Sequence, residues 1–484
     1  MPQLVKDGRA YLSAPVNIAP LVYVRILFGA VMFWEVCRFF HYDWISRYYI
    51  KPDFLFKYFG FGWVHPLPGQ GMYYLFLLLG LASLFIMVGF WYRRATVFFF
   101  FGFTYIFLLD ATRYLNHFYL ISLVSFLMVF IPANRALSLD VRLNRATWSA
   151  TAPRWALWMI RFQIGVAYFF GGVAKLSYDW IHGEPIRTWI SRKQDFPIVG
   201  QFFDQEWMVY FFVIGGIFLD LFIVPLLLWE KTRPWMFTAA VFFHLVNAEL
   251  FRIGIFPWFM MAMTLVFFPP EVPEKVLNIC GLRINPKPEN MKVRNRHKNL
   301  RGHDRAPAGT MAAAVQGPAA AAVPLWMLAG MGLFVVFQVL MPLRHLLYPG
   351  NVNWTEEGHR LSWHMKLRDK EGRLLLKVQS HDTIWYIAPK VFLRKHQLKV
   401  VPGHPDLIIQ LAHHVGEQFR ENGHPHVRVY ALTDVQLNFR KPQLLLDSTV
   451  NLLQVRPGLA PAPFIVPLKE PLPRIRKLTT NGQS

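Results

Sequence analysis

Cysteine is scarce in this chain, which has only Cys37 and Cys280 among its 484 residues. Two cysteines so far apart provide neither a disulfide framework nor a CxxC metal motif. Acidic residues are also few, with 29 against 51 lysines and arginines. The N-terminus lacks the basic region, compact apolar run and small-residue cleavage site of a signal peptide. We therefore expect the first apolar block, near residues 21–40, to be retained as a membrane span.

Apolar residues, by contrast, are abundant: 54% of the chain is hydrophobic, 16% is aromatic, and the mean hydropathy is +0.28. They collect in uninterrupted blocks before about residue 345, and the remainder reads like a soluble domain. A transmembrane helix needs roughly 20 mainly apolar residues. The sequence therefore predicts a polytopic α-helical membrane protein with about nine transmembrane helices. The candidate spans are 21–40, 72–91, 94–110, 118–132, 155–175, 208–229, 236–248, 254–268 and 323–343.

The formal net charge of +22 by itself could indicate nucleic-acid binding. Much of the excess, however, lies in short loops beside the apolar blocks, where basic residues orient membrane proteins. With the N-terminus in the cytoplasm, the inner loops are basic and the outer loops have mixed charge. We therefore expect an integral membrane protein in contact with lipid, with a cytoplasmic N-terminus and an extracytoplasmic (periplasmic or lumenal) C-terminal domain. No nucleic-acid partner is expected.

The same patterns divide the chain into four segments. A transmembrane helical domain covers residues 1–282, a basic, Ala/Pro-rich cytoplasmic loop covers 283–322, and the last transmembrane helix covers 323–345. The loop could lie against anionic headgroups or be a solvated loop without a partner. Residues 346–484 contain short alternating, β-rich runs such as HVRVYALTDVQLNF, and one run with helical spacing, DLIIQLAHHVGEQFRENG. This pattern predicts a mainly β domain, either α+β or similar to a β-sandwich.

Polar residues at membrane depth are costly and often mark function. On the predicted topology, five of them converge on the outer ends of three spans. Asn116 and His117 begin the fourth span, Lys175 ends the fifth, and His244 and Asn247 lie at the outer end of the seventh. Because span direction alternates, this convergence on one membrane face is not automatic. It suggests a polar pocket that opens to the outside.

Each of these residues has a simpler interpretation. Lys175 could extend to the membrane interface, as lysines at helix ends commonly do. His117 and His244 could bond a neighbouring helix, and Asn116 could cap the fourth helix. The small residues that precede the lysine, Gly171 and Gly172, allow close helix approach but could also make room for a ligand.

Several ordered blocks of sequence resemble a known family. The segment FGGVAKLSYDWIHGEP is similar to the part of vitamin K-dependent γ-glutamyl carboxylases that holds their catalytic lysine. The blocks LLDATRYLNHFYLISLVSFLMVFIPANRALSLD, RFQIGVAYFFGGVAKL, FFHLVNAELFRIGIFPW and LRHLLYPGNVNWTEEGHRLSWHMKL follow the family order. The resemblance covers most of residues 18–270 and continues more weakly through about 335–455. The chain thus resembles a compact homologue in the horizontally transferred transmembrane domain family.

The resemblance implies a lyase that couples two reactions. Vitamin K hydroquinone and O2 give vitamin K epoxide, and the energy released allows CO2 to be added to the γ-carbon of a protein glutamate. The γ-proton is far less acidic than any side-chain acid, and each pKa unit of mismatch costs about 1.4 kcal/mol. The oxidised cofactor must therefore supply the strong base. Reduced vitamin K, O2, CO2 and a glutamate-containing peptide are the expected partners, and no metal is expected.

The resemblance also implies roles for individual residues. Lys175 is the expected base that deprotonates the hydroquinone, Asn116 would orient a quinone oxygen, and His117 would hydrogen-bond or deliver a proton. His244 and Asn247 are candidates for binding contacts. The chain departs from animal carboxylases in its shorter outer domain and in lacking the cysteines for their interdomain disulfide. An alternative is therefore a membrane quinol-oxidising (epoxidising) enzyme without glutamate carboxylation. A transporter or lipid-binding scaffold would instead predict internal repeats, and none is evident.

Overall fold

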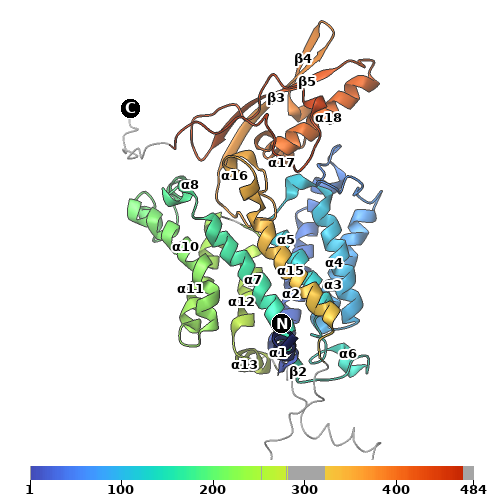
Figure 1. Cartoon of the computed structure of the whole chain (residues 1–484), viewed down its shortest axis with the longest axis vertical. Helices are drawn as coiled ribbons and strands as arrows, with labels where there is room; N and C mark the ends of the chain where they lie inside the picture. The colour runs from blue at the N-terminus through green and yellow to red at the C-terminus, as the bar shows by residue number, and fades with distance from the viewer. Residues whose placement is uncertain (1, 252, 280, 282–321, 473–484) are drawn as a thin grey trace, which may run out of the picture.

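The computed structural model describes residues 2–251, 253–279, 281 and 322–472. A bundle of long helices carries the C-terminal domain on one of its ends (Figure 1). The long helices are α2 (Ala19–His41), α3 (Gly71–Val88), α4 (Tyr92–Leu109), α5 (Asn116–Phe130), α7 (Arg154–Ala174), α10 (Glu206–Leu228), α11 (Arg233–Phe251), α12 (Phe256–Thr264) and α15 (Leu325–Leu343). The shorter elements of this part are α1 (Pro2–Ser13), α6 (Leu139–Arg142), α8 (Tyr178–Ile181), α9 (Ile186–Ser191), α13 (Glu271–Ile279) and an antiparallel pair, β1 (Pro15–Asn17) and β2 (Thr151–Pro153).

Each of the nine segments expected to span a membrane is helical in the structure, with bounds that agree within a few residues. By length and composition, five described helices could cross a membrane: α2, α3, α7, α10, and α15 with the turn that follows it. The apolar stretches Asn116–Phe130 and Phe256–Phe267 are shorter. The structure thus supports a helical membrane protein, whereas the count of nine spans stays a prediction. The predicted loop 283–322 lies outside the described residues except for Ala322.

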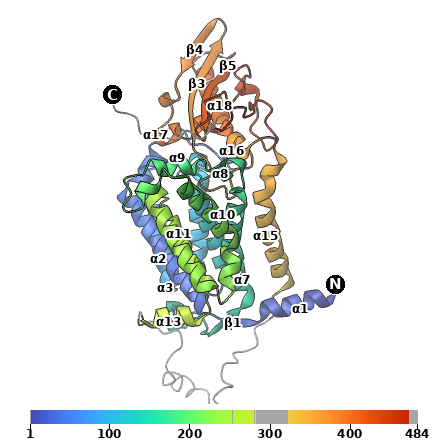
Figure 2. The same ribbon diagram turned by 90° about the vertical axis from the view of Figure 1, so that its left-hand side faces the viewer.

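Apolar side chains face outward from the bundle. On α10, Phe211, Ile214, Phe218 and Phe222 are all exposed, at spacings of three or four residues that place them along one face of the helix. In water such a stripe would normally be covered by the rest of the protein, whereas lipid tails solvate it directly. α15 also carries exposed apolar side chains and lies along the outside of the bundle (Figure 2).

The C-terminal domain is built on one antiparallel sheet of order β4-β3-β5, formed by β3 (Lys370–Ser380), β4 (Thr383–Ile387) and β5 (Arg428–Leu437). Leu376 of β3 pairs with Ile387 on one side and with Ala431 on the other. The buried residues of α18 (Pro405–Glu421) pack with the sheet in one core, alongside the short helices α16 (Val352–Thr355) and α17 (Lys395–Leu398). Among the described residues this is the α+β alternative. A sandwich of two facing sheets is not what the sequence forms, because a helix covers the core.

Buried polar contacts join the C-terminal domain to the helical bundle. Arg440 donates from both terminal nitrogens to the two carboxylate oxygens of Asp179, each at 2.6 Å, and Asn438 donates to the same carboxylate at 2.6 Å. Trp189, on α9, donates its indole N–H to Asp369 at 2.7 Å. These bonds fix the domain against α8 and α9, at the end of the bundle nearest the domain (Figure 2). Lys175 follows α7 and precedes α8 in the chain.

Candidate active site

Lys175 ends α7, and its side chain turns towards α10. Its ammonium nitrogen forms an ion pair with the carboxylate of Asp220, in the middle of α10, and both side chains are buried. The sequence analysis did not single out Asp220. The sequence alone could have identified Asp220, because an acidic residue within an apolar span is itself a mark of function. The finding identifies Asp220 as the direct partner of the candidate base.

Close packing of α7 against α10 makes this ion pair possible. A Cβ added at Gly172 would lie 2.8 Å from the Leu221 side chain and 3.0 Å from its backbone nitrogen. On α10, the position of Gly216 leaves room for the lysine stem, since a Cβ there would lie 3.6 Å from Lys175 Cε. A Cβ at Gly171 would lie 3.0 Å from Met365 Cε. Neither Gly171 nor Gly172 lines the cavities described below, and both serve close approach.

Lys175 lines a narrow cavity with His244 and Asn247 of α11, which we name the Lys175 cavity. Nε2 of His244 is 2.7 Å from the hydroxyl of Tyr168, whereas Nδ1 is buried without a hydrogen-bond partner in the described part of the chain. Aromatic side chains form much of the wall: Trp180, Trp189, Phe212, Phe243, Phe251 and Phe256. An apolar pocket with a few convergent polar groups is typical of a small-molecule site.

Asn116 and His117 line a different and larger cavity of about 600 Å³, which we name the basic chamber. Asn116 does not cap α5: Leu115 occupies the cap position, and no side chain bonds there. Its amide oxygen instead accepts a hydrogen bond from the hydroxyl of Tyr114 at 2.8 Å, and its amide nitrogen donates to the carbonyl of His364 at 3.1 Å. The five polar residues predicted to share one pocket are therefore divided between two adjacent cavities.

The wall between the two cavities comes from both the helical bundle and the C-terminal domain. Four residues line both the Lys175 cavity and the basic chamber: Ile253, Phe256, Met365 and Lys366. The segment 361–368 holds the last two, and its fully buried Trp363 is part of the core of the helical bundle. Two hydrogen bonds fix the segment: the backbone N–H of Leu361 donates to the Tyr114 hydroxyl at 2.7 Å, and the Asn116 side-chain amide donates to the carbonyl of His364.

The backbone of this wall is strained. Leu361, Trp363 and Lys366 have φ values of 65°, 60° and 53°, in a region that residues other than glycine rarely adopt. Such conformations cost on the order of 1–3 kcal/mol each and persist where the surrounding structure holds them, often at functional sites. The bundle therefore imposes the path that brings Met365 and Lys366 to the boundary.

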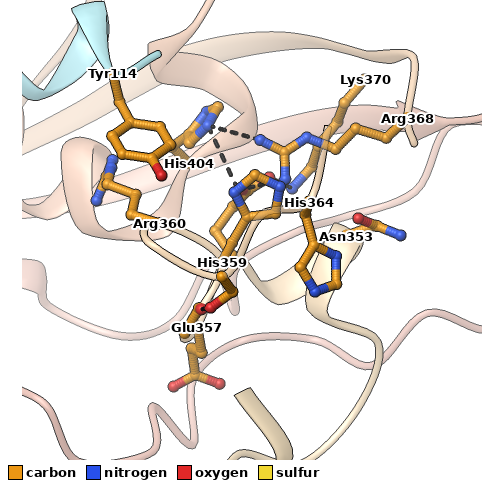
Figure 3. Close-up of polar contacts among 12 residues, drawn as sticks. Tyr114, Asn353, Glu357, His359, Arg360, His364, Arg368, Lys370 and His404 are labelled. Atoms are coloured by element: carbon orange, nitrogen blue, oxygen red, sulfur yellow. Dashed lines mark hydrogen bonds and ion pairs between the residues drawn. The ribbon is translucent and has the colours of Figure 1, made fainter. Parts of the chain in front are cut away.

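Glu356 is the centre of a buried charge cluster beside the basic chamber. Figure 3 shows its partners Arg368, Lys370 and His404. The Glu356 carboxylate is 2.6 Å from Arg368 Nη1, 3.1 Å from Lys370 Nζ and 3.5 Å from His404 Nε2. Burial would raise the pKa of Glu356, but the attraction of Arg368, His404 and Lys370 outweighs it and lowers this pKa. Burial lowers the pKa of Lys370 to about 8 and that of His404 to about 4. Near neutral pH the cluster thus pairs one carboxylate with cations beside neutral histidines.

The sequence analysis missed this cluster and Lys366. Glu356 and Lys366 lie in the block LRHLLYPGNVNWTEEGHRLSWHMKL, which was quoted only for its family resemblance. Arg368, Lys370 and His404 lie beyond that block. Within the described ranges, no group of three or more histidine, cysteine or acidic side chains is arranged to hold a metal ion.

Comparison with protein-family models gives two matches. The model of the HTTM domain matches residues 13–271, more than half of the chain, and the model of the vitamin K-dependent gamma-carboxylase lumenal domain matches residues 324–471. No solved structure matches the chain significantly. With the apolar helices, these matches support a membrane protein with a lumenal C-terminal region. The two matches together cover both parts of the fold that enclose the candidate site, and the chain belongs to the vitamin K-dependent γ-carboxylase family.

Proposed function

We propose that this protein couples the oxygenation of vitamin K hydroquinone to its epoxide with the γ-carboxylation of a protein glutamate by CO2. One observation carries the proposal: the cavity of a buried lysine shares a wall with a large chamber lined by cations. The two half-reactions need these two environments. One has to hold an apolar quinol beside a base, and the other has to bind an acidic acceptor within reach of it.

The Lys175 cavity fits a hydroquinone by the nature of its walls. Its aromatic side chains suit a flat ring system, and the unpartnered Nδ1 of His244 is available to a ligand hydroxyl. When bound, reduced vitamin K supplies, on reaction with O2, a base stronger than any side chain. Lys175 would have the smaller task of accepting a hydroquinone proton in the state in which its amine is neutral, and the ion pair with Asp220 corresponds to the state after that transfer. Asp220 then stabilises the ammonium so formed, since an opposite charge nearby favours the charged state.

The basic chamber favours an acidic acceptor. Its charged lining residues are five cations, Arg38, Arg113, Arg360, Lys366 and Arg368, and two acids, Glu35 and Glu356. A lining with excess positive charge attracts anions and discriminates against neutral or cationic ligands. This supports carboxylation of glutamate over quinol oxidation alone, in spite of the short outer domain. Asn116 and His117 line this chamber and not the Lys175 cavity, where Asn116 was expected to orient a quinone oxygen. We therefore propose that both act on the chamber side of the shared wall.

Purified protein in detergent tests the proposal directly. It would be given reduced vitamin K, O2, a glutamate-containing peptide and labelled bicarbonate, beside the variants Lys175→Ala and Lys390→Ala. Lys390 is an exposed lysine of the C-terminal domain that lines neither cavity. Epoxide and labelled peptide, both lost in Lys175→Ala and both retained in Lys390→Ala, are expected. Epoxide alone would favour the quinol-oxidising alternative, and no Lys175-dependent turnover of either kind would contradict both enzymes.

A further inference from the structure

Lys366 occupies an unusual position in this protein. It lies in the strained wall segment, with φ of 53°, and lines both the Lys175 cavity and the basic chamber. Its side chain is accessible, and the space it faces is that of the two cavities. Among the described residues, Lys366 is the one cation that lines both cavities.

The ammonium of Lys366 has no hydrogen-bond or ion-pair partner among the protein groups that the structure describes. It lies 5.4 Å from the ring centre of Trp189 and 5.9 Å from that of Phe251. Aromatic faces attract a cation but leave its N–H donors unused. Partial burial lowers the pKa of Lys366, whereas the negative charge of the nearby Asp369 acts to raise it. Asp369 itself accepts a hydrogen bond from Trp189 at 2.7 Å.

Three of the other four cations of the chamber differ from Lys366 in this respect: Arg368 is paired with Glu356, Arg360 with Asp406, and Arg38 with Glu35. These pairs reduce the charge that each offers to a ligand. Arg113, the fourth, lies over the ring of Tyr48 at 3.8 Å and lines the basic chamber alone. Lys366 combines an ammonium without an anionic partner with a position at the junction of the two cavities.

We propose that Lys366 binds the side-chain carboxylate of the acidic acceptor at the boundary between the basic chamber and the Lys175 cavity. The carboxylate of a glutamate that enters from the chamber would pair with this ammonium. Its γ-methylene group would then face the cavity in which the base is generated. The ammonium would also stabilise negative charge that develops on the carboxylate when the γ-proton is removed, since a cation fixed beside developing negative charge stabilises it. The proposal rests on the proposed function and names the acceptor-binding residue of that same site.

The test compares Lys366→Met with Lys366→Arg and with Lys390→Met as a matched surface control. Methionine keeps the stem on Trp189 and Phe251 but removes the charge. In Lys366→Met we expect the KM for the glutamate peptide to rise roughly tenfold or more, as for loss of a charge-assisted hydrogen bond. The KM for hydroquinone should stay within about twofold. Lys366→Arg should recover part of the loss, and Lys390→Met should match the unaltered protein. An unchanged peptide KM in Lys366→Met would overturn the proposal.

A binding measurement separates this inference from the proposed function. The dissociation constants of a glutamate peptide and of its glutamine counterpart would be measured without hydroquinone. The unaltered protein should prefer the glutamate peptide, and Lys366→Met should lose most of that preference. If this holds while no turnover occurs, the inference stands and the proposed function falls. If turnover occurs but the preference survives in Lys366→Met, the inference alone falls. A folded Lys366→Met protein is confirmed by an unchanged unfolding midpoint.

Discussion

Lys175 and Asp220 form a buried ion pair across two helices of the bundle, at the C-terminal end of α7 and in the middle of α10. Their side chains are 7% and 5% exposed. In such a place an unpaired charge is far more costly than a paired one. The pair therefore links the candidate base to the packing of the bundle, which gives two predictions about stability.

Asp220→Asn should destabilise the protein by about 3–5 kcal/mol, because it leaves the Lys175 ammonium without its buried partner. The double variant Lys175→Met/Asp220→Asn should regain much of this stability and remain inactive. Unfolding in detergent, with activity measured in parallel, checks both statements. If the double variant were as unstable as Asp220→Asn, Asp220 would not stabilise the protein through its ion pair with Lys175.

Gly172→Ala should weaken the contact between α7 and α10, because its Cβ would approach the Leu221 backbone nitrogen to 3.0 Å. Overpacking of this kind typically costs about 1–3 kcal/mol. Gly215→Ala is the control, since a Cβ at Gly215 on α10 meets no atom within 4 Å. Unfolding midpoints and hydroquinone turnover should fall for Gly172→Ala and stay unchanged for Gly215→Ala. If both variants lowered the unfolding midpoint equally, Gly172 would not be required for the close approach of α7 to α10.

Asp179→Ala should loosen the C-terminal domain from the bundle. The carboxylate accepts both nitrogens of Arg440 as well as Asn438, and its loss leaves a buried guanidinium unpaired, at a cost of about 3–5 kcal/mol. Limited proteolysis should then cut the chain faster, and carboxylation should fall with the displaced wall. Asp195→Ala, which removes an exposed acid, should behave like the unaltered protein. If Asp179→Ala were cut no faster than the unaltered protein, the contact of Asp179 with Arg440 would not be what holds the C-terminal domain on the bundle.

The basic chamber should make the protein labile in acid. Burial lowers the pKa of His404 from 6.5 to about 4, so the unfolded chain binds more protons than the folded one between these values. Stability should therefore fall as the pH drops through this window, by up to about 1.4 kcal/mol per pH unit for one histidine. Glu356 acts in the same direction, because its lowered pKa gives stability that is lost below the ordinary glutamate pKa.

His404→Gln should flatten this pH dependence, because glutamine binds no proton in either state. Unfolding measured from pH 7 to 4 at constant ionic strength tests this. His426→Gln, at an exposed histidine, is the control and should keep the full slope. An equal slope in His404→Gln and in the unaltered protein would assign the acid lability to other groups.

Much of the helical part could be predicted from the sequence, because a span is a local property. Continuous apolar runs placed each of the nine helices within a few residues. The C-terminal domain was less certain, since alternation predicts strands but not what covers them. The single sheet with α18 against it depends on long-range pairing, such as that of Leu376 with Ala431.

The candidate site, like the fold, could be predicted from the sequence only in part. Lys175, Asn116, His117, His244 and Asn247 stood out by chemistry, as polar residues beside apolar runs. Their arrangement could not be predicted, because the segment 361–368, which lies far beyond all of them in the chain, contributes to the wall between them. The sequence by itself determined a helical membrane protein of the carboxylase family with a lysine at one end of a span. Only the tertiary structure decided that Asp220 pairs with that lysine, and that Lys366 stands between two cavities. Burial and charge pairing depend on which helices and loops meet in space.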